Sequence, residues 1–215
     1  MAPSNRTLKT TSHETLLADR VNFRGHVYVD QHISTQADGA PLGQGTTFRS
    51  WLSPRPPANR YFFPINLQRA FIDGAIPLVG RVYNMKGFID GISQDGALEL
   101  KFTSSMTSQR PFRRAAAHEP PLTVNAVGTI CALSMINILS KQPVCAITLE
   151  HTTVNDMPKL LIDFIIPLGA DWSFDLDSNH IGLRAWFYGD LAGVNVENGR
   201  TVVVIHSGRV FGVEH

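Results

Sequence analysis

The sequence predicts an all-β protein built from two tandem small β-barrels. The apolar and β-branched runs of the chain are short, and they end at Gly, Pro, Asn or Asp, as strands usually do. No long segment has the 3.6-residue periodicity of an amphipathic helix. The two halves of the chain also resemble each other at an offset of about 102 residues. A repeat of this length indicates two similar modules rather than a solenoid, whose units run to about 20–50 residues.

Each half contains the same order of expected elements: a long Gly-containing strand, two more strands, an irregular piece, a strand with spaced glycines and a last strand. In the first half the strand segments are 21–30, 46–53, 60–67, 80–91 and 97–104. In the second half they are 123–139, 144–154, 159–168, 182–193 and 200–214. Residues 67–75 fit one or two helical turns, and Ser12 is a suitable cap for a short helix over residues 12–20.

The proposed repeat depends on matched residues in these strands. The matches are Val21/Val124, Asn22/Asn125, Gly25/Gly128 and Gly96/Gly199 at an offset of 103 residues, and Gly80/Gly182, Gly87/Gly189 and Gly91/Gly193 at an offset of 102. Chance agreement between two Gly-rich β sequences is the alternative interpretation.

The order of strands in each half resembles the OB-fold, a five-stranded Greek-key barrel. Glycines inside strands suit the tight bends of such a barrel. The resemblance predicts a flexible N-terminal arm over residues 1–19, a basic barrel over 20–105, a linker over 106–121 and an acidic barrel over 122–215.

The net charge of +1 conceals an uneven distribution of charge. Residues 1–115 contain fourteen Lys and Arg against eight Asp and Glu, a net charge of +6, whereas residues 116–215 contain five against ten, a net charge of −5. Cys131 and Cys145 are the only cysteines, which favours a reduced, intracellular location, cytoplasmic or nuclear, without a disulfide. The sequence has no apolar run long enough to span a membrane and no secretion signal.

Four strands of the first half place an Arg beside an aromatic residue on one face, because alternate residues of a strand share a face. The residues are Arg24 and Tyr28, Arg49 and Trp51, Arg60 and Phe62, and Arg81 and Tyr83. Guanidinium groups bind phosphate, and aromatic rings stack unpaired bases. We therefore expect these residues to form one outer face that binds single-stranded DNA or RNA. The alternative is a set of ordinary cation–π surface pairs.

The second half has a different character, since its acidic balance would repel phosphate. Its first strand, within residues 123–139, is apolar on both faces, which indicates an interface. That interface is with the first half, with a second copy of the chain or with another protein. We expect self-association, so that the second barrel serves assembly into a homo-oligomer. Arg184, Trp186 and Tyr188 share one face of their strand, and the sequence leaves open which side of the sheet this face occupies.

The sequence contains no standard motif for catalysis, and we expect neither a metal nor a cofactor. His26, Asp30 and His32 share a strand face but extend over about 20 Å, too far to hold one ion. Residues 175–180 imitate the start of a calcium loop but lack its glycine, which predicts a solvated turn. Because successive side chains of a strand point to opposite faces, we expect Asp163 to face solvent. If Asp163 is buried instead, its carboxylate needs a polar partner.

Two other functions are compatible with the sequence. One is a self-assembling structural β-protein, in which the basic half of one copy meets the acidic half of the next. The other is a β-barrel enzyme or small-ligand binder with aromatic residues in a pocket. The absence of catalytic motifs favours a protein that is not an enzyme.

Overall fold

The computed structural model describes residues 19, 21–34, 46–52, 63–69, 77–107, 122–136, 144–151, 159–166, 177–195 and 198–211. The strands are β1 (Asn22–Tyr28), β2 (Gln31–Ser34), β3 (Thr46–Leu52), β4 (Phe63–Arg69), β5 (Val82–Ile92), β6 (Leu98–Thr107), β7 (Thr123–Ile136), β8 (Val144–His151), β9 (Leu160–Ile165), β10 (Arg184–Asn195) and β11 (Arg200–Val210). The fold is all-β, as the sequence predicts.

The described part of the chain contains one short helical turn, η1 (Ser178–His180). The Asp177 carboxylate accepts a hydrogen bond from the Asn179 amide, and the Asp177 amide donates to His180 Nδ1, so this segment is a capped turn. Asp177, Ser178 and Asn179 are exposed, as expected for a solvated turn, and residues 175 and 176 of the predicted turn lie outside the described residues. No helix among the described residues has the length and hydropathy to cross a membrane.

The expected helix over residues 67–75 is wrong at its beginning. Leu67 and Arg69 belong to β4, which pairs in parallel with β6. Leu67 lies opposite Leu100, and both side chains are completely buried. The gain from burying this apolar pair exceeds a weak local preference for helix. Residues 70–75 lie outside the described residues, and so does the expected helix over residues 12–20 apart from Asp19.

Strands β7 to β11 close a five-stranded barrel. Their order around the barrel is β7–β8–β9–β11–β10, and β10 pairs again with β7. The β9–β11 ladder is parallel, whereas the other ladders of the barrel are antiparallel. This is the strand order of the predicted OB-like barrel.

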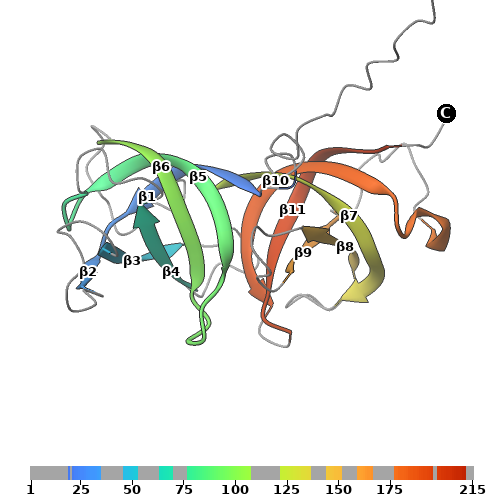
Figure 1. Ribbon diagram of the computed structural model, residues 1–215, viewed down its shortest axis with the longest axis horizontal. Helices are drawn as coiled ribbons and strands as arrows, with labels where there is room; N and C mark the ends of the chain where they lie inside the picture. The colour runs from blue at the N-terminus through green and yellow to red at the C-terminus, as the bar shows by residue number, and fades with distance from the viewer. Residues whose placement is uncertain are drawn as a thin grey trace, which may run out of the picture.

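Strands β1 to β6 pair in the order β1–β5–β6–β4–β3–β2. The β4–β6 ladder is parallel and the other ladders are antiparallel. Only residues 29 and 30 separate β1 from β2 in the chain. If β1 and β2 are counted as one bent strand, the pairings follow the order found in β7 to β11. Figure 1 shows the two groups of strands side by side.

Two matched glycines occupy equivalent irregularities in the two groups. The β5–β6 ladder shifts register between Lys86 and Gly87, and the β10–β11 ladder shifts between Tyr188 and Gly189. A Cβ atom at Gly87 would overlap the carbonyl oxygen of Lys101, and one at Gly189 would overlap that of Val204. Both ladders therefore need glycine where the two backbones approach closely.

The two groups are joined by an antiparallel pairing of β1 with β7. Asn22 lies opposite Asn125, Phe23 opposite Val124, and Arg24 opposite Thr123. The apolar strand predicted over residues 123–139 thus has an interface with the first half of the chain. Asn125 of this strand is exposed in the single chain, and an interface with a second copy or with another protein stays a prediction.

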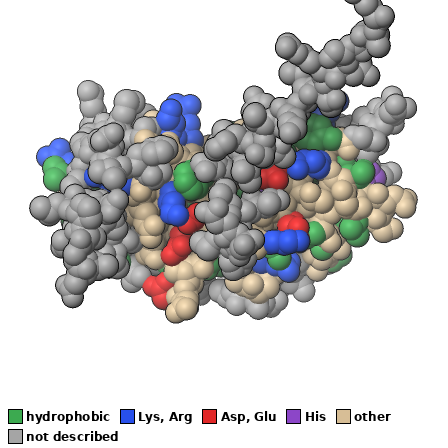
Figure 2. Space-filling view, viewed as in Figure 1, with side chains coloured by type: hydrophobic (Ala, Val, Ile, Leu, Met, Phe, Trp, Pro, Cys, Tyr) green, Lys and Arg blue, Asp and Glu red, His purple; other side chains and the backbone are tan. Residues whose placement is uncertain are grey.

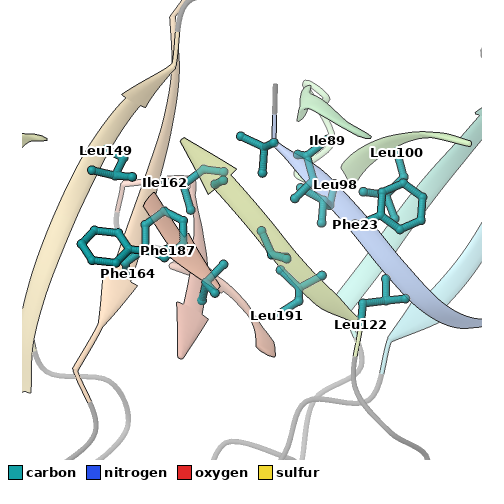
Figure 3. Packing of buried hydrophobic residues seen from close by; sticks show 14 of the residues in the cluster. Phe23, Ile89, Leu98, Leu100, Leu122, Leu149, Ile162, Phe164, Phe187 and Leu191 are labelled. Atoms are coloured by element: carbon teal, nitrogen blue, oxygen red, sulfur yellow. The ribbon is translucent and has the colours of Figure 1, made fainter. Parts of the chain in front are cut away.

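The apolar core continues from one group of strands into the other. Phe23, Leu98 and Leu100 belong to the first group, and Leu122 and Val124 extend the same cluster into β7. In the second group the rings of Phe164 and Phe187 pack at a centroid distance of 5.3 Å. Figure 3 shows this pair among the buried side chains. The core therefore fixes the relative position of the two groups.

Asp163 is buried, which corrects the expectation that it faces solvent. Its carboxylate accepts a hydrogen bond of 2.8 Å from the Thr148 hydroxyl. Asn198 donates at 3.3 Å, and Arg200 Nη1 lies 3.4 Å away. Three partners from two other segments thus compensate for the lost hydration of the carboxylate. Cys131 and Cys145 are free thiols.

Substitution of Gly87 by Ala should lower the free energy of unfolding by roughly 1–3 kcal/mol, because the new methyl group collides with the Lys101 backbone. Gly91→Ala is the matched control, since no described atom lies within 4 Å of the place that its new methyl group would take. Urea denaturation measures both variants. Equal stability of the two variants would contradict the close approach of β5 and β6.

His151 should make the protein sensitive to acid. Its Nδ1 lies 2.8 Å from the Val127 carbonyl oxygen, and burial lowers its pKa to about 4 from an ordinary value of 6.5. Between these pH values the unfolded chain binds a proton that the folded chain does not, so the free energy of unfolding falls as pH falls. The loss should reach about 3 kcal/mol once the pH is below 4. Denaturation of wild type and His151→Gln from pH 7 to 4 should show a flatter dependence for the variant.

Candidate nucleic-acid interface

Strand β1 presents the outward face that the sequence predicts. Arg24 is exposed and Tyr28 is half-buried, whereas Phe23 and Val27 are buried in the core. The backbone of Arg24 is held by the Thr123 hydroxyl, which donates to its carbonyl oxygen at 3.0 Å. Arg24 is therefore an exposed cation on a well-fixed strand.

Strand β5 presents the face opposite to the one that was predicted. Arg81 is exposed, but Tyr83 is only 6% exposed and Met85 is completely buried. The Tyr83 hydroxyl accepts a hydrogen bond of 2.7 Å from the Leu78 amide, which satisfies its polar atom. The placement of Tyr83 on an outer face with Arg81 is therefore wrong. Lys86 and Phe88 occupy the outward face of β5 instead.

Strands β3 and β4 carry the remaining predicted residues. Arg49 and Trp51 belong to β3, whose backbone register pairs them with Asn66 and Pro64 of β4. The side chains of Arg49 and Trp51 lie outside the described part of the structure, and so do residues Arg60 and Phe62.

The predicted residues whose backbone is described lie on β1, β3 and β5, and these strands are near neighbours. β1 pairs with β5, and β3 pairs with β2, which follows β1 after two residues. Arg60 and Phe62 lie outside the described residues, as do the side chains of Arg49 and Trp51. An outer face shared with Arg24 and Tyr28 stays a prediction for these four residues, whereas the buried Tyr83 does not belong to it.

A different surface brings cations and rings together where the two groups of strands meet. We call it the seam face and define it by Asn22, Arg24, Lys86, Phe88, Asn125 and Tyr188. The register places four of these residues in one row across β5, β1, β7 and β10, in the order Phe88, Asn22, Asn125 and Tyr188. In the next row Lys86 lies directly opposite Arg24.

The seam face is hollowed. A groove of about 560 Å³ is lined by all six of its residues. Asn22 and Asn125 are exposed, while Phe88 and Tyr188 are half-buried. The groove thus has polar amides between two aromatic rings and two cations on one side.

Within the described part of the structure, the two cations of the seam face have no counter-ion. Lys86 and Arg24 are exposed, and no described carboxylate forms an ion pair with either of them. Like charges directly opposite each other in an antiparallel ladder destabilise it. An anion bound between Lys86 and Arg24 would remove this repulsion.

Acidic groups lie toward the other end of β5. Asp90 pairs with Lys101 at 2.6 Å. Burial raises the pKa of Glu99, and the nearby Asp90 carboxylate adds to the rise. On the face shown in Figure 2, acidic side chains gather toward the hairpin between β5 and β6. A polyanion is therefore favoured near Lys86 and disfavoured near this hairpin.

Strand β10 supplies the aromatic side of the seam face. Trp186 Nε1 donates to Asn125 Oδ1 at 2.6 Å. The ring of Tyr188 lies 6.0 Å from that of His206, whose Nε2 is 2.9 Å from Asp190 Oδ2. Trp186 and Tyr188 thus lie on the same outward side of the continuous sheet as Phe88, which settles the side that the sequence left open.

Other kinds of site receive no support from the described residues. Within them, no three His, Cys, Asp or Glu side chains are close enough to hold a metal ion. The groove on the seam face is not lined by His26 or Asp30, which share a strand face, or by the buried Asp163.

Sequence reasoning missed Lys86, Phe88 and the two asparagines. Lys86 and Phe88 share parity within "NMKGFID", so their common face was visible in the sequence. Asn22 and Asn125 were matched as repeat positions, but nothing local indicates that they pair with each other. Their place beside Tyr188 depends on the β1–β7 and β7–β10 ladders.

The fold has a counterpart among solved structures. The crystal structure of wild-type single-stranded DNA binding protein from Thermus aquaticus is similar to this chain with a TM-score of 0.55 and 10% sequence identity, over 92% of this chain and 94% of that one. At this identity the likeness shows the fold alone. No protein-family model and no curated protein matches the sequence.

Substitution of Lys86 by Glu should stabilise the folded protein. It replaces the repulsion from Arg24 by a cross-strand attraction, which should raise the free energy of unfolding by about 0.2–1 kcal/mol at low salt. Lys86→Gln is the matched control and should lie between wild type and Lys86→Glu. Urea denaturation at low and high salt measures the effect, which salt should reduce. A Glu variant no more stable than the Gln variant would contradict the facing arrangement.

Proposed function

We propose that this chain is a single-stranded nucleic-acid-binding protein. The main support is the exposed Arg24–Lys86 pair, in which two cations face each other without a described counter-ion. A phosphate group would satisfy both cations at once. The likeness to a solved single-stranded DNA binding protein supports the same proposal through the fold. The proposed ligand is single-stranded DNA or RNA.

We infer that the two groups of strands are tandem OB-like barrels related by the repeat of about 102 residues. The matched Gly87 and Gly189 lie at equivalent register shifts, which supports this inference. The matched Asn22 and Asn125 pair with each other in an antiparallel ladder. Two equivalent strands paired antiparallel at an equivalent residue are related by a local twofold axis.

The proposed organisation keeps the sequence-based boundaries: an arm over residues 1–19, a basic barrel over 20–105, a linker over 106–121 and an acidic barrel over 122–215. At the end of the arm, Asp19 forms an ion pair with Arg184 of β10. An intracellular location is part of the same proposal.

The binding residues of the first barrel are proposed to act in two ways. Arg24 and Arg81 contact phosphate, and Tyr28 packs against a base or sugar. Four further residues are proposed to bind nucleic acid on the sequence pattern alone, because the structure does not describe their side chains: Arg49, Trp51, Arg60 and Phe62. Tyr83 is left out, because its buried ring cannot reach a base.

Assembly into a homo-oligomer remains a second element of the proposal. Met135, on the outward side of β7, is 65% exposed. An exposed flexible apolar side chain at the end of a long strand is a suitable contact for another copy of the chain. Assembly through this end of β7 would leave the seam face accessible.

Trp51→Ala should weaken binding of a fluorescently labelled oligothymidylate by about 1–3 kcal/mol, the contribution of one stacked base. Trp51→Phe keeps an aromatic ring and is the matched control, which should bind nearly as well as wild type. Fluorescence anisotropy at low and moderate salt measures affinity, and wild-type affinity should fall steeply with salt. The proposed function fails if wild type does not bind at low salt.

A further inference from the structure

We propose that the second barrel also contacts the nucleic acid, so that one strand lies across the seam face and is held by residues of both barrels. This inference rests on the proposed function and adds a binding segment to it. The acidic half of the chain then supplies part of the binding surface in addition to any part in assembly.

The first support is the cross-strand row. Phe88 and Tyr188 stand at its ends, with Asn22 and Asn125 between them. Three strand spacings separate the two rings, a backbone distance of about 14 Å. A single strand crossing the row meets a ring of the first barrel, two amides that can hydrogen-bond bases, and a ring of the second barrel.

The second support is the charge beside this row. Arg24 and Lys86 border it on the first barrel. On the second barrel, Arg209 is exposed and lies opposite Trp186 in the β10–β11 ladder. Asp190 is the nearby acid, but it is only 7% exposed and contacts His206. Cations that can meet phosphate thus belong to the seam face in the first barrel and lie near it in the second, despite the acidic balance of the second half.

These features favour a nucleic acid over a second copy of the chain at this face. The centre of a protein–protein interface is depleted in charged residues. The seam face has two exposed amides at its centre and two facing cations beside them. A copy of the chain docked here would bury Arg24 and Lys86 without the phosphates that could neutralise them.

The test compares Tyr188→Ala and Tyr188→Phe in the full-length chain. The probe is a labelled oligothymidylate of about 30 nucleotides, longer than the 4–16 nucleotides that one OB barrel covers. Tyr188→Ala should lower affinity roughly 5- to 150-fold, the loss of one stacked base, and Tyr188→Phe should restore most of it. Circular dichroism checks the fold of both variants, and Phe88→Ala provides a second test from the opposite end of the row.

Photocrosslinking tests the contact directly and does not depend on the stability of a variant. Irradiation of a complex with 5-bromodeoxyuridine oligonucleotide should crosslink the β10 peptide that contains Tyr188, as identified by mass spectrometry. If wild type binds but this peptide does not crosslink and Tyr188→Ala binds normally, the second barrel makes no contact and the inference is overturned, while the proposed function stands. If Tyr188→Ala changes the molar mass in light scattering and leaves affinity unchanged, the face joins copies of the chain and the inference is also overturned. Absence of binding by wild type overturns both.

Discussion

The arrangement of this molecule depends on a short antiparallel pairing between β1 and β7. Only three residue pairs form it, yet it joins two groups of strands into one continuous sheet. Because Phe23 and Val124 are opposite each other and buried, the same pairing also joins the cores. The row from Phe88 to Tyr188 exists because this register places Asn22 beside Asn125. A slip by one residue would turn the row into the core.

The seam face combines features that do not stabilise the fold by themselves. Lys86 and Arg24 repel each other across the ladder, and Phe88 and Tyr188 keep part of their apolar surface in water. By contrast, acidic and basic groups farther along β5 are paired, as Asp90 is with Lys101. Among the described residues, Arg24 and Lys86 thus have no ion pair beside the groove, and a bound polyanion would relieve their repulsion. The acidic balance of the second half also overstates the negative charge at its surface. One of its acids, Asp163, is buried and has its own polar partners.

Local pattern was a reliable guide to the faces of β1 and an unreliable one to those of β5. In β1, alternation correctly separates exposed Arg24 from buried Phe23 and Val27. At the start of β5, Val82 and Tyr83 are both buried, so counting from Arg81 assigns the wrong face to the strand. The Tyr83 ring lies in the core, and the Leu78 amide supplies the hydrogen bond that its buried hydroxyl needs. That contact comes from the turn before β5 and has no signature in alternation.

The sequence by itself determined the all-β class and the approximate strands, because turn residues and strand alternation act over a few neighbouring positions. It also marked Gly87 and Gly189 as matched positions inside strands, but the close approach of the backbones there became visible only in the structure. Only the tertiary structure decided which strands are neighbours, that Asp163 is buried among Thr148 and Arg200, and that Lys86 lies beside Arg24. These outcomes depend on how a sheet closes and on the register between segments far apart in the chain. Hydrophobic pattern constrains the face that each strand buries, but it is the same for several strand orders.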